Sequence, residues 1–180
     1  MREVLDNEVS QIEHIGIRRL VLQCLENAPS YFWEVPSSST GKYHPKDEFC
    51  AGGLVLHTKR TFYVSEELCR ALSIKGVERD CVLAAAIMHD LCKQGFPKDE
   101  GYTVDGHGYL WSQLLRMSYT KQEILSMPFI QTISRLILYH MGQYDLPYIL
   151  DWDDKLATIV HLSDYIASRD NILVKVDEKE

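Results

Sequence analysis

An apolar run that ends in a histidine and an aspartate constrains this chain more than any other feature. Residues 81–88 read Cys-Val-Leu-Ala-Ala-Ala-Ile-Met, and His89 and Asp90 follow at once. Such a run favours a buried helix, in which ionisable side chains are rare unless they are paired or bound to a metal. A metal site is therefore the first hypothesis for the His89-Asp90 pair.

The rest of the chain predicts helices and almost no strands. Apolar residues recur at helical spacing, whereas strict two-residue alternation is nearly absent. We predict helices over about residues 4–27, 53–72, 78–92, 107–117, 121–126, 129–140 and 152–169. The 180 residues suffice for one full hydrophobic core. The expected fold is a single compact all-α domain over residues 1–180, with its motif-bearing core at about 50–170 and a charged tail at 171–180.

Three of these helices carry a metal-type side chain on their apolar face. His89, His140 and Asp164 each follow an apolar residue by four positions, and residues at this spacing lie on one side of a helix. Helical bundles build metal sites from such inward-facing residues. One histidine on an apolar face is more often a hydrogen-bonded core residue, but the whole series favours a shared site. Its members are His57, His89, Asp90, His107, His140 and Asp164.

The bulk composition argues against several classes of function. A net charge of −7 disfavours broad, non-specific nucleic-acid binding, which requires a basic surface. The five cysteines form no Cys-x-x-Cys pair, so we expect free and mostly buried thiols in a reducing compartment. No segment approaches the roughly 20 apolar residues of a membrane span, and the mixed-charge N-terminus lacks a signal-peptide apolar region. We expect a cytoplasmic protein that has no membrane partner and no extended nucleic-acid surface.

The order and local context of the candidate ligands resemble the H…HD…D signature of the HD-domain metal-dependent phosphohydrolases. The resemblance covers about residues 50–170 and implies an HD-domain helical bundle with a metal site. The segments that carry it are Gly52-Gly-Leu-Val-Leu-His-Thr58, Met88-His-Asp-Leu-Cys-Lys93, Asp105-Gly-His-Gly108 and Leu162-Ser-Asp-Tyr-Ile166.

The resemblance also implies how these residues share their metals. In this family the first histidine, the HD pair and the last aspartate hold one ion; here they are His57, His89, Asp90 and Asp164. Members with two further histidines hold a second ion, and His107 and His140 match those positions. The expected cofactor is one or, by this match, two divalent ions, with Asp90 between them. Histidine suits Fe, Mn, Co, Ni or Zn better than Mg alone, although Mg could occupy one site.

The charge of such a site agrees with phosphate chemistry. Two divalent ions would bring four positive charges, whereas Asp90 and Asp164 supply only two negative ones, so the site would attract a phosphate anion. The resemblance implies a metal-activated water as nucleophile, with Asp90 and Lys93 as catalytic residues. We predict a phosphohydrolase that cleaves phosphate esters or anhydrides of a nucleotide or a related small phosphorylated metabolite.

Candidates for binding this substrate are Lys42, His44, Lys93 and Arg169. Lys42 and His44 lie in the loop before Gly52, which serves either as a phosphate-contacting lid or as an ordinary surface loop. Lys93 can hold a phosphate oxygen or satisfy the C-terminal end of a helix. Arg169 can clamp a phosphate through two N–H groups or form a surface salt bridge. Aromatic residues near the ligand segments can stack on a nucleobase or pack in the core or its rim: Tyr109, Trp111, Tyr144 and Tyr148.

Two rival functions remain open on the sequence alone. The first is a phosphodiesterase acting on oligonucleotides, cyclic nucleotides or dinucleotides. An open basic groove across the metal site would favour it, whereas a closed pocket would favour a nucleotidase. The second is a non-catalytic nucleotide-binding sensor, which the loss of a ligand would have favoured. All the candidate ligands are present.

Overall fold

The computed structural model describes residues 2–38, 41, 43–144 and 151–176, which form helices joined by turns and loops. These ranges contain no β-strand, and the all-α prediction is confirmed. None of the described helices is long and apolar enough to span a membrane. The α-helices are α1 Asp6–Ser10, α2 Ile15–Glu26, α3 Gly53–Ala71, α4 Gly76–Met88, α5 His107–Ser118, α6 Lys121–Ser126, α7 Ile130–Leu138 and α8 Lys155–Ala167. The short 3-10 helices are η1 Arg2–Leu5, η2 Ser30–Trp33, η3 Lys46–Glu48 and η4 Gly142–Tyr144.

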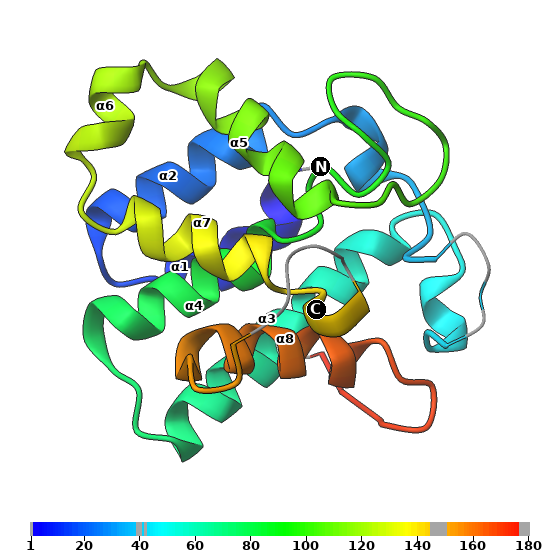
Figure 1. The fold of residues 1–180 in the computed structure, drawn as a ribbon. Helices are drawn as coiled ribbons and strands as arrows, with labels where there is room; N and C mark the ends of the chain where they lie inside the picture. Colours follow the sequence, from blue (N-terminus) through cyan, green and yellow to red (C-terminus); the bar gives the residue numbers. More distant parts are fainter. Residues whose placement is uncertain (1, 39–40, 42, 145–150, 177–180) are drawn as a thin grey trace.

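Helix α4 forms the centre of the bundle (Figure 1). Every residue from Asp80 to Met88 is buried, and α2, α3, α7 and α8 all contact this helix. A helix that is apolar all round has to be covered all round, which explains why the longest apolar run of the sequence becomes the core. His89 and Asp90 follow directly and are buried as well.

Helices α3 and α8 come from distant parts of the sequence and lie side by side (Figure 1). Their pairing brings His57 on α3 next to Asp164 on α8. Helix α5 packs against α7 in the same way and brings His107 next to His140. Helix packing thereby gathers residues that are far apart in the sequence.

The helix predicted over residues 4–27 is interrupted, so that prediction was wrong in its extent. Helices α1 and α2 are separated by residues 11–14. Nδ1 of His14 caps α2 by accepting a hydrogen bond from the Ile17 N–H at 3.2 Å. The N–H of His14 in turn donates to Asp80 on α4 at 2.6 Å. The break therefore depends on a contact with a distant helix, which local periodicity does not reveal.

Helices α4 and α7 are also shorter than predicted, and in each case the lost residues include a candidate ligand. In a continuing helix the carbonyl of Ala86 would accept from the backbone N–H four residues later. Here it accepts from Nδ1 of His89 at 2.8 Å. The carbonyl of Ile137 accepts from Nδ1 of His140 at 2.6 Å. Helix α4 ends directly before His89 and α7 ends two residues before His140, so each imidazole bonds to a carbonyl of the last helical turn.

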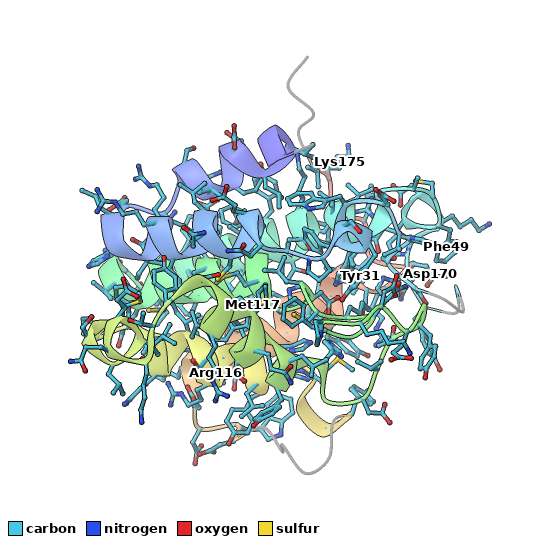
Figure 2. All side chains as sticks on the ribbon, turned by 90° about the horizontal axis from the view of Figure 1, so that it is seen from above. Tyr31, Phe49, Arg116, Met117, Asp170 and Lys175 are labelled. Carbon is cyan, nitrogen blue, oxygen red and sulfur yellow. The ribbon has the colours of Figure 1, made fainter. Side chains whose placement is uncertain are left out.

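Side chains fill the spaces between the helices (Figure 2). Tyr31 is buried, and its hydroxyl donates to the carbonyl of Gly95 at 2.8 Å and accepts from the N–H of Gln94 at 3.1 Å. Arg116 and Met117, by contrast, lie on the exposed surface of α5. Tyr31 thus holds the turn that follows the His89-Asp90 pair.

The cysteines generate a direct test of this packing. All five are free thiols, and only Cys50 is exposed. Burial raises the pKa of Cys24, Cys81 and Cys92 to about 12 and that of Cys69 to about 11. Because the thiolate is the reactive form, we expect a disulfide reagent such as DTNB to label one thiol rapidly in the native protein and five in denaturant. Rapid labelling of two or more thiols in the native protein would contradict this packing. Rapid labelling of any thiol in native Cys50→Ser would contradict it as well.

Candidate metal centre

The candidate ligands meet in the interior, although they come from five segments of the chain. His57 belongs to α3, His107 begins α5 and Asp164 belongs to α8. His89-Asp90 and His140 lie in the turns that follow α4 and α7. The four histidines and Asp90 are at most 2% exposed, and the side chain of Asp164 is 17% exposed. Burying so many ionisable groups requires partners that balance them.

The two oxygens of Asp90 face two different pairs of histidines. Oδ2 lies 3.8 Å from Nε2 of His57 and 3.4 Å from Nε2 of His89. Oδ1 lies 3.0 Å from Nε2 of His107 and 3.8 Å from Nε2 of His140. This is the arrangement expected of a carboxylate that lies between two cation sites.

Asp164 completes the first of these two sets of atoms. Its Oδ1 lies 3.0 Å from Nε2 of His57 and 3.8 Å from Nε2 of His89. We call His57, His89, Asp90 Oδ2 and Asp164 the first group, and His107, His140 and Asp90 Oδ1 the second group. In each group the ligand atoms of Asp90 and its two histidines lie within 4.8 Å of one another, close enough to share an ion. The second group has fewer protein ligands and so leaves more positions for water or substrate.

Hydrogen bonds at the outer ring nitrogens fix the direction of three imidazoles. Nδ1 of His89, His107 and His140 lies 2.8, 3.0 and 2.6 Å from the carbonyl three residues earlier in the chain. A carbonyl only accepts, so Nδ1 carries the proton, and the neutral ring presents the lone pair of Nε2 toward Asp90. Outer hydrogen bonds of this kind orient metal-binding histidines in proteins.

The result is a cluster of acceptors that fits a cation. Nε2 of His107 and Nε2 of His140 lie 3.0 Å apart, and both face Asp90. No hydrogen-bond partner for the buried Nε2 of His89 occurs among the described residues. Acceptors gathered in this way repel one another unless a proton or a cation lies between them. Imidazole and carboxylate ligands together suit a divalent Fe, Mn, Co, Ni or Zn ion.

The pKa shifts of the buried histidines differ in direction from one histidine to another. Burial, together with His107 and His89, lowers the pKa of His140 to about 3, so this ring is neutral and metal-competent at pH 7. Burial also lowers the pKa of His57. For His89 burial acts in the same direction, but the carboxylates of Asp90 and Asp164 outweigh it and raise the pKa above its ordinary value. The carboxylates around His89 thus outweigh its burial, whereas burial dominates at His57 and His140.

The carboxylate and the lysine beside the histidines are both charged. Burial would raise the pKa of Asp90, but Lys93, His89 and His107 hold it well below its ordinary value. Burial would lower the pKa of Lys93, but Asp90 and Asp164 raise it instead. Nζ of Lys93 donates to Oδ2 of Asp90 at 2.6 Å. Lys93 therefore brings a positive charge directly to the centre of the site.

A cavity of about 510 Å³ opens onto this centre. His107 and Asp164 line it, and so do three of the predicted substrate contacts, His44, Lys93 and Arg169. The fourth, Lys42, lies outside the described residues. Of the predicted aromatic candidates, Tyr144 lines the cavity, Trp111 is buried in the core, Tyr109 is exposed and Tyr148 lies outside the described residues.

Arg169 is held between two tyrosine rings at the wall of the cavity. Its guanidinium carbon lies 3.9 Å from the ring centre of Tyr165 and 5.2 Å from that of Tyr43. In the part of the chain that the structure describes, the buried Nε of Arg169 has no hydrogen-bond partner. An arginine stacked on aromatic rings keeps its N–H edge available for an anion.

Two further residues, Glu48 and His161, belong to this site but are not among the predicted site residues. Glu48 is fully buried, and its Oε2 lies 2.8 Å from Nδ1 of His44 and 3.7 Å from Nδ1 of His57. His161 lines the cavity, and its Nδ1 donates to the carbonyl of His140 at 2.7 Å. The only sequence signal for Glu48 was its spacing of four residues from His44, in a loop without periodicity.

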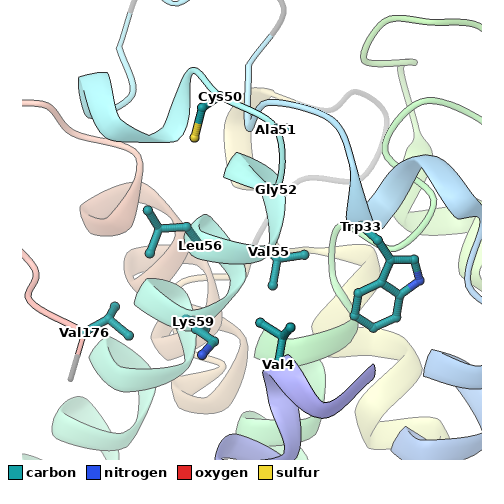
Figure 3. Close-up of a pocket in the computed structure, with 9 residues that line it drawn as sticks. All are labelled: Val4, Trp33, Cys50, Ala51, Gly52, Val55, Leu56, Lys59 and Val176. Atoms are coloured by element: carbon teal, nitrogen blue, oxygen red, sulfur yellow. The ribbon is translucent and has the colours of Figure 1, made fainter. Parts of the chain in front are cut away.

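A second cavity, of about 270 Å³, lies beside the start of α3 (Figure 3). Apolar side chains such as Val4, Trp33 and Val55 line it, with Cys50 and Lys59. None of the candidate ligands takes part in it. Of these two cavities, only the one of about 510 Å³ is lined by candidate metal ligands, His107 and Asp164.

The HD domain family matches residues 54–169, well over half of the chain. This chain belongs to the HD domain family. The matched range includes every candidate ligand, and the family consists in general of metal-dependent phosphohydrolases. Comparisons with curated proteins and with solved structures gave no match. The prediction of an HD domain is confirmed.

Metal binding should stabilise the protein, because an ion would satisfy the buried acceptors. At a free Co²⁺ concentration of about 100 times Kd, the gain is about 2.7 kcal/mol, which raises Tm by about 5–10 °C for a chain of this size. Thermal unfolding with Co²⁺ and after chelation measures this shift. His89→Ala should reduce it strongly, whereas His14→Ala, which changes a helix cap outside the site, should retain it. Equal Tm values with and without metal in the wild type would contradict the fit.

Proposed function

We propose that this chain is a metal-dependent phosphohydrolase that cleaves a phosphate ester or anhydride of a nucleotide or a related small phosphorylated metabolite. The observation that carries the proposal is the division of the Asp90 oxygens between two histidine pairs beside a cavity with cationic side chains. Membership of the HD domain family supports the hydrolase class. The shape and charge of the cavity support a small anionic substrate.

The first and second groups would each hold one divalent ion, with Asp90 shared between them. When bound, two such ions supply Lewis acidity toward phosphoryl oxygens and a water of lowered pKa. Asp90 and Asp164 contribute two negative charges against four positive ones. The loaded site would therefore keep a net positive charge that attracts phosphate.

The cationic residues of the cavity would bind and orient the substrate. Lys93 lies at the centre of the site, where its ammonium can hold a phosphoryl oxygen or give a proton to the leaving oxygen. Arg169 would clamp a second edge of the phosphate or a neighbouring phosphate group through two N–H groups. His44, held by Glu48, would contact the substrate from the opposite loop. Tyr144 would pack against the base or sugar.

The dimensions of the cavity favour a small substrate over a nucleic-acid strand. A volume of about 510 Å³ lies within the range of small-molecule sites, about 300–1,000 Å³. Among the described residues, one lysine and one arginine line the cavity, Lys93 and Arg169. The whole chain carries a net charge of −7. A strand-binding groove would need a longer row of cations along the backbone.

Product analysis tests the proposal directly. Metal-stripped protein would be loaded in turn with Mn²⁺, Co²⁺, Fe²⁺, Ni²⁺ and Zn²⁺ and incubated with nucleotides, dinucleotides, cyclic nucleotides and short oligonucleotides. We expect release of phosphate or pyrophosphate from at least one mononucleotide. Asp90→Asn should lower kcat/KM by more than about 100-fold, because it weakens both groups. Arg169→Lys should raise KM by about 10-fold with a smaller effect on kcat, and Arg116→Lys on the α5 surface is the matched control.

Three outcomes would contradict the proposal. Turnover that survives both chelation and Asp90→Asn would exclude the metal centre as its origin. Cleavage restricted to internucleotide or cyclic phosphodiester bonds would assign the phosphodiesterase activity instead. Tight nucleotide binding without turnover, across all five metals, would assign a sensor.

A further inference from the structure

The loop before α3 places a buried carboxylate against the candidate metal centre. Glu48, the last residue of η3, is 0% exposed. Its Oε2 lies 2.8 Å from Nδ1 of His44 and 3.7 Å from Nδ1 of His57. The two imidazole rings meet edge to face, with centroids 5.0 Å apart. One carboxylate oxygen thus lies between a histidine of the cavity wall and a candidate metal ligand.

Arg60 holds this carboxylate in place. Its Nη1 donates to Oε1 of Glu48 at 2.6 Å, and Nη1 and Nη2 also pair with the two oxygens of Asp47 at 3.0 and 2.6 Å. Its Nε donates to the carbonyl of Val174 at 3.2 Å. Because Arg60 occupies Oε1, only Oε2 of Glu48 is directed at the histidines.

The backbone around Glu48 is packed closely against the start of α3. The carbonyl of Glu48 accepts from the N–H of Ser37 at 3.1 Å. A Cβ atom on Gly53 would lie 1.9 Å from the same carbonyl oxygen, so only glycine allows this approach. The position of the Glu48 side chain is therefore fixed by main-chain packing as well as by Arg60.

His57 differs from the other histidines in what can hold its outer nitrogen. Nδ1 of His89, His107 and His140 is bonded to a carbonyl at a helix end or in a loop. His57 lies inside α3, where helix bonding occupies the carbonyls, and its buried Nδ1 has no hydrogen-bond partner among the described residues. Glu48 is the carboxylate that faces it, and a contraction of under about 1 Å would form a hydrogen bond.

We infer that Glu48 is a positioning residue that orients the metal ligand His57 and the cavity residue His44 through one shared oxygen. A carboxylate partner fixes the tautomer of a metal-binding imidazole and increases its basicity, so the ion binds more tightly. The shared oxygen also links the residue that would contact substrate to the first group. The inference rests on the proposed function only for its effect on turnover, because metal affinity tests it without a substrate.

Glu48→Gln tests the inference, since it keeps the shape of the side chain and removes its charge. Metal-stripped protein would be titrated with Co²⁺ and followed by the visible absorption of the bound ion. We expect the Kd of the tighter ion to rise by about 10–100-fold. Asp47→Asn is the matched control, because Asp47 binds the same arginine and its pairing is with Arg60 rather than with a histidine. Both variants should lower Tm by weakening the contacts of Arg60, but only Glu48→Gln should weaken Co²⁺ binding.

His44→Gln separates the two effects of Glu48. It should raise KM and leave Co²⁺ affinity unchanged, whereas Glu48→Gln should change both. Wild-type Co²⁺ affinity in Glu48→Gln would overturn the inference. A third Co²⁺ per chain that is lost in Glu48→Gln would also overturn it, because His44, Glu48 and His57 would then hold an ion of their own. Failure of the proposed function is distinguishable, since wild type would turn over no substrate while Co²⁺ affinity still separated the two variants.

Discussion

The rest of this structure depends on the interactions that surround the buried carboxylate of Asp90. A lone charge in the core would be very costly, and here two pairs of imidazoles and the ammonium of Lys93 surround it. Helices α3, α5, α7 and α8 all have to bring their ends or faces to this point, next to the apolar helix α4. The bundle is therefore arranged around one charged group as well as around its apolar core.

The histidines around Asp90 are oriented by two different means. His89, His107 and His140 lie where helices end or begin. The rings of His89 and His140 bond to carbonyls of the last turn of α4 and α7, and the ring of His107 bonds to a loop carbonyl before α5. His57 lies within a helix and faces a carboxylate from the preceding loop instead. The early ends of α4 and α7 therefore have a positive role, because they allow the rings of His89 and His140 to bond to these carbonyls and to direct Nε2 toward Asp90.

The fold class and the convergence of the candidate ligands could be predicted, because apolar periodicity determines which faces are buried and the motif residues lie on those faces. The helix ends could not, because they depend on ring-to-carbonyl bonds and, at residues 11–14, on Asp80 of a distant helix. Glu48 lies in a loop without periodicity, and its environment exists only once Arg60 and two histidines surround it. Arg169 stacks on Tyr165, four residues earlier, but its second aromatic contact is with Tyr43, which is distant in the sequence.

The number of ions bound per chain tests the central claim most directly. Equilibrium dialysis with Co²⁺, followed by elemental analysis, would be applied to the wild type, His140→Ala and Asp90→Asn. A carboxylate shared by two groups predicts two ions in the wild type, one in His140→Ala, and weakened binding of both ions in Asp90→Asn. A single ion in the wild type that His140→Ala retains with unchanged affinity would contradict the two-ion centre.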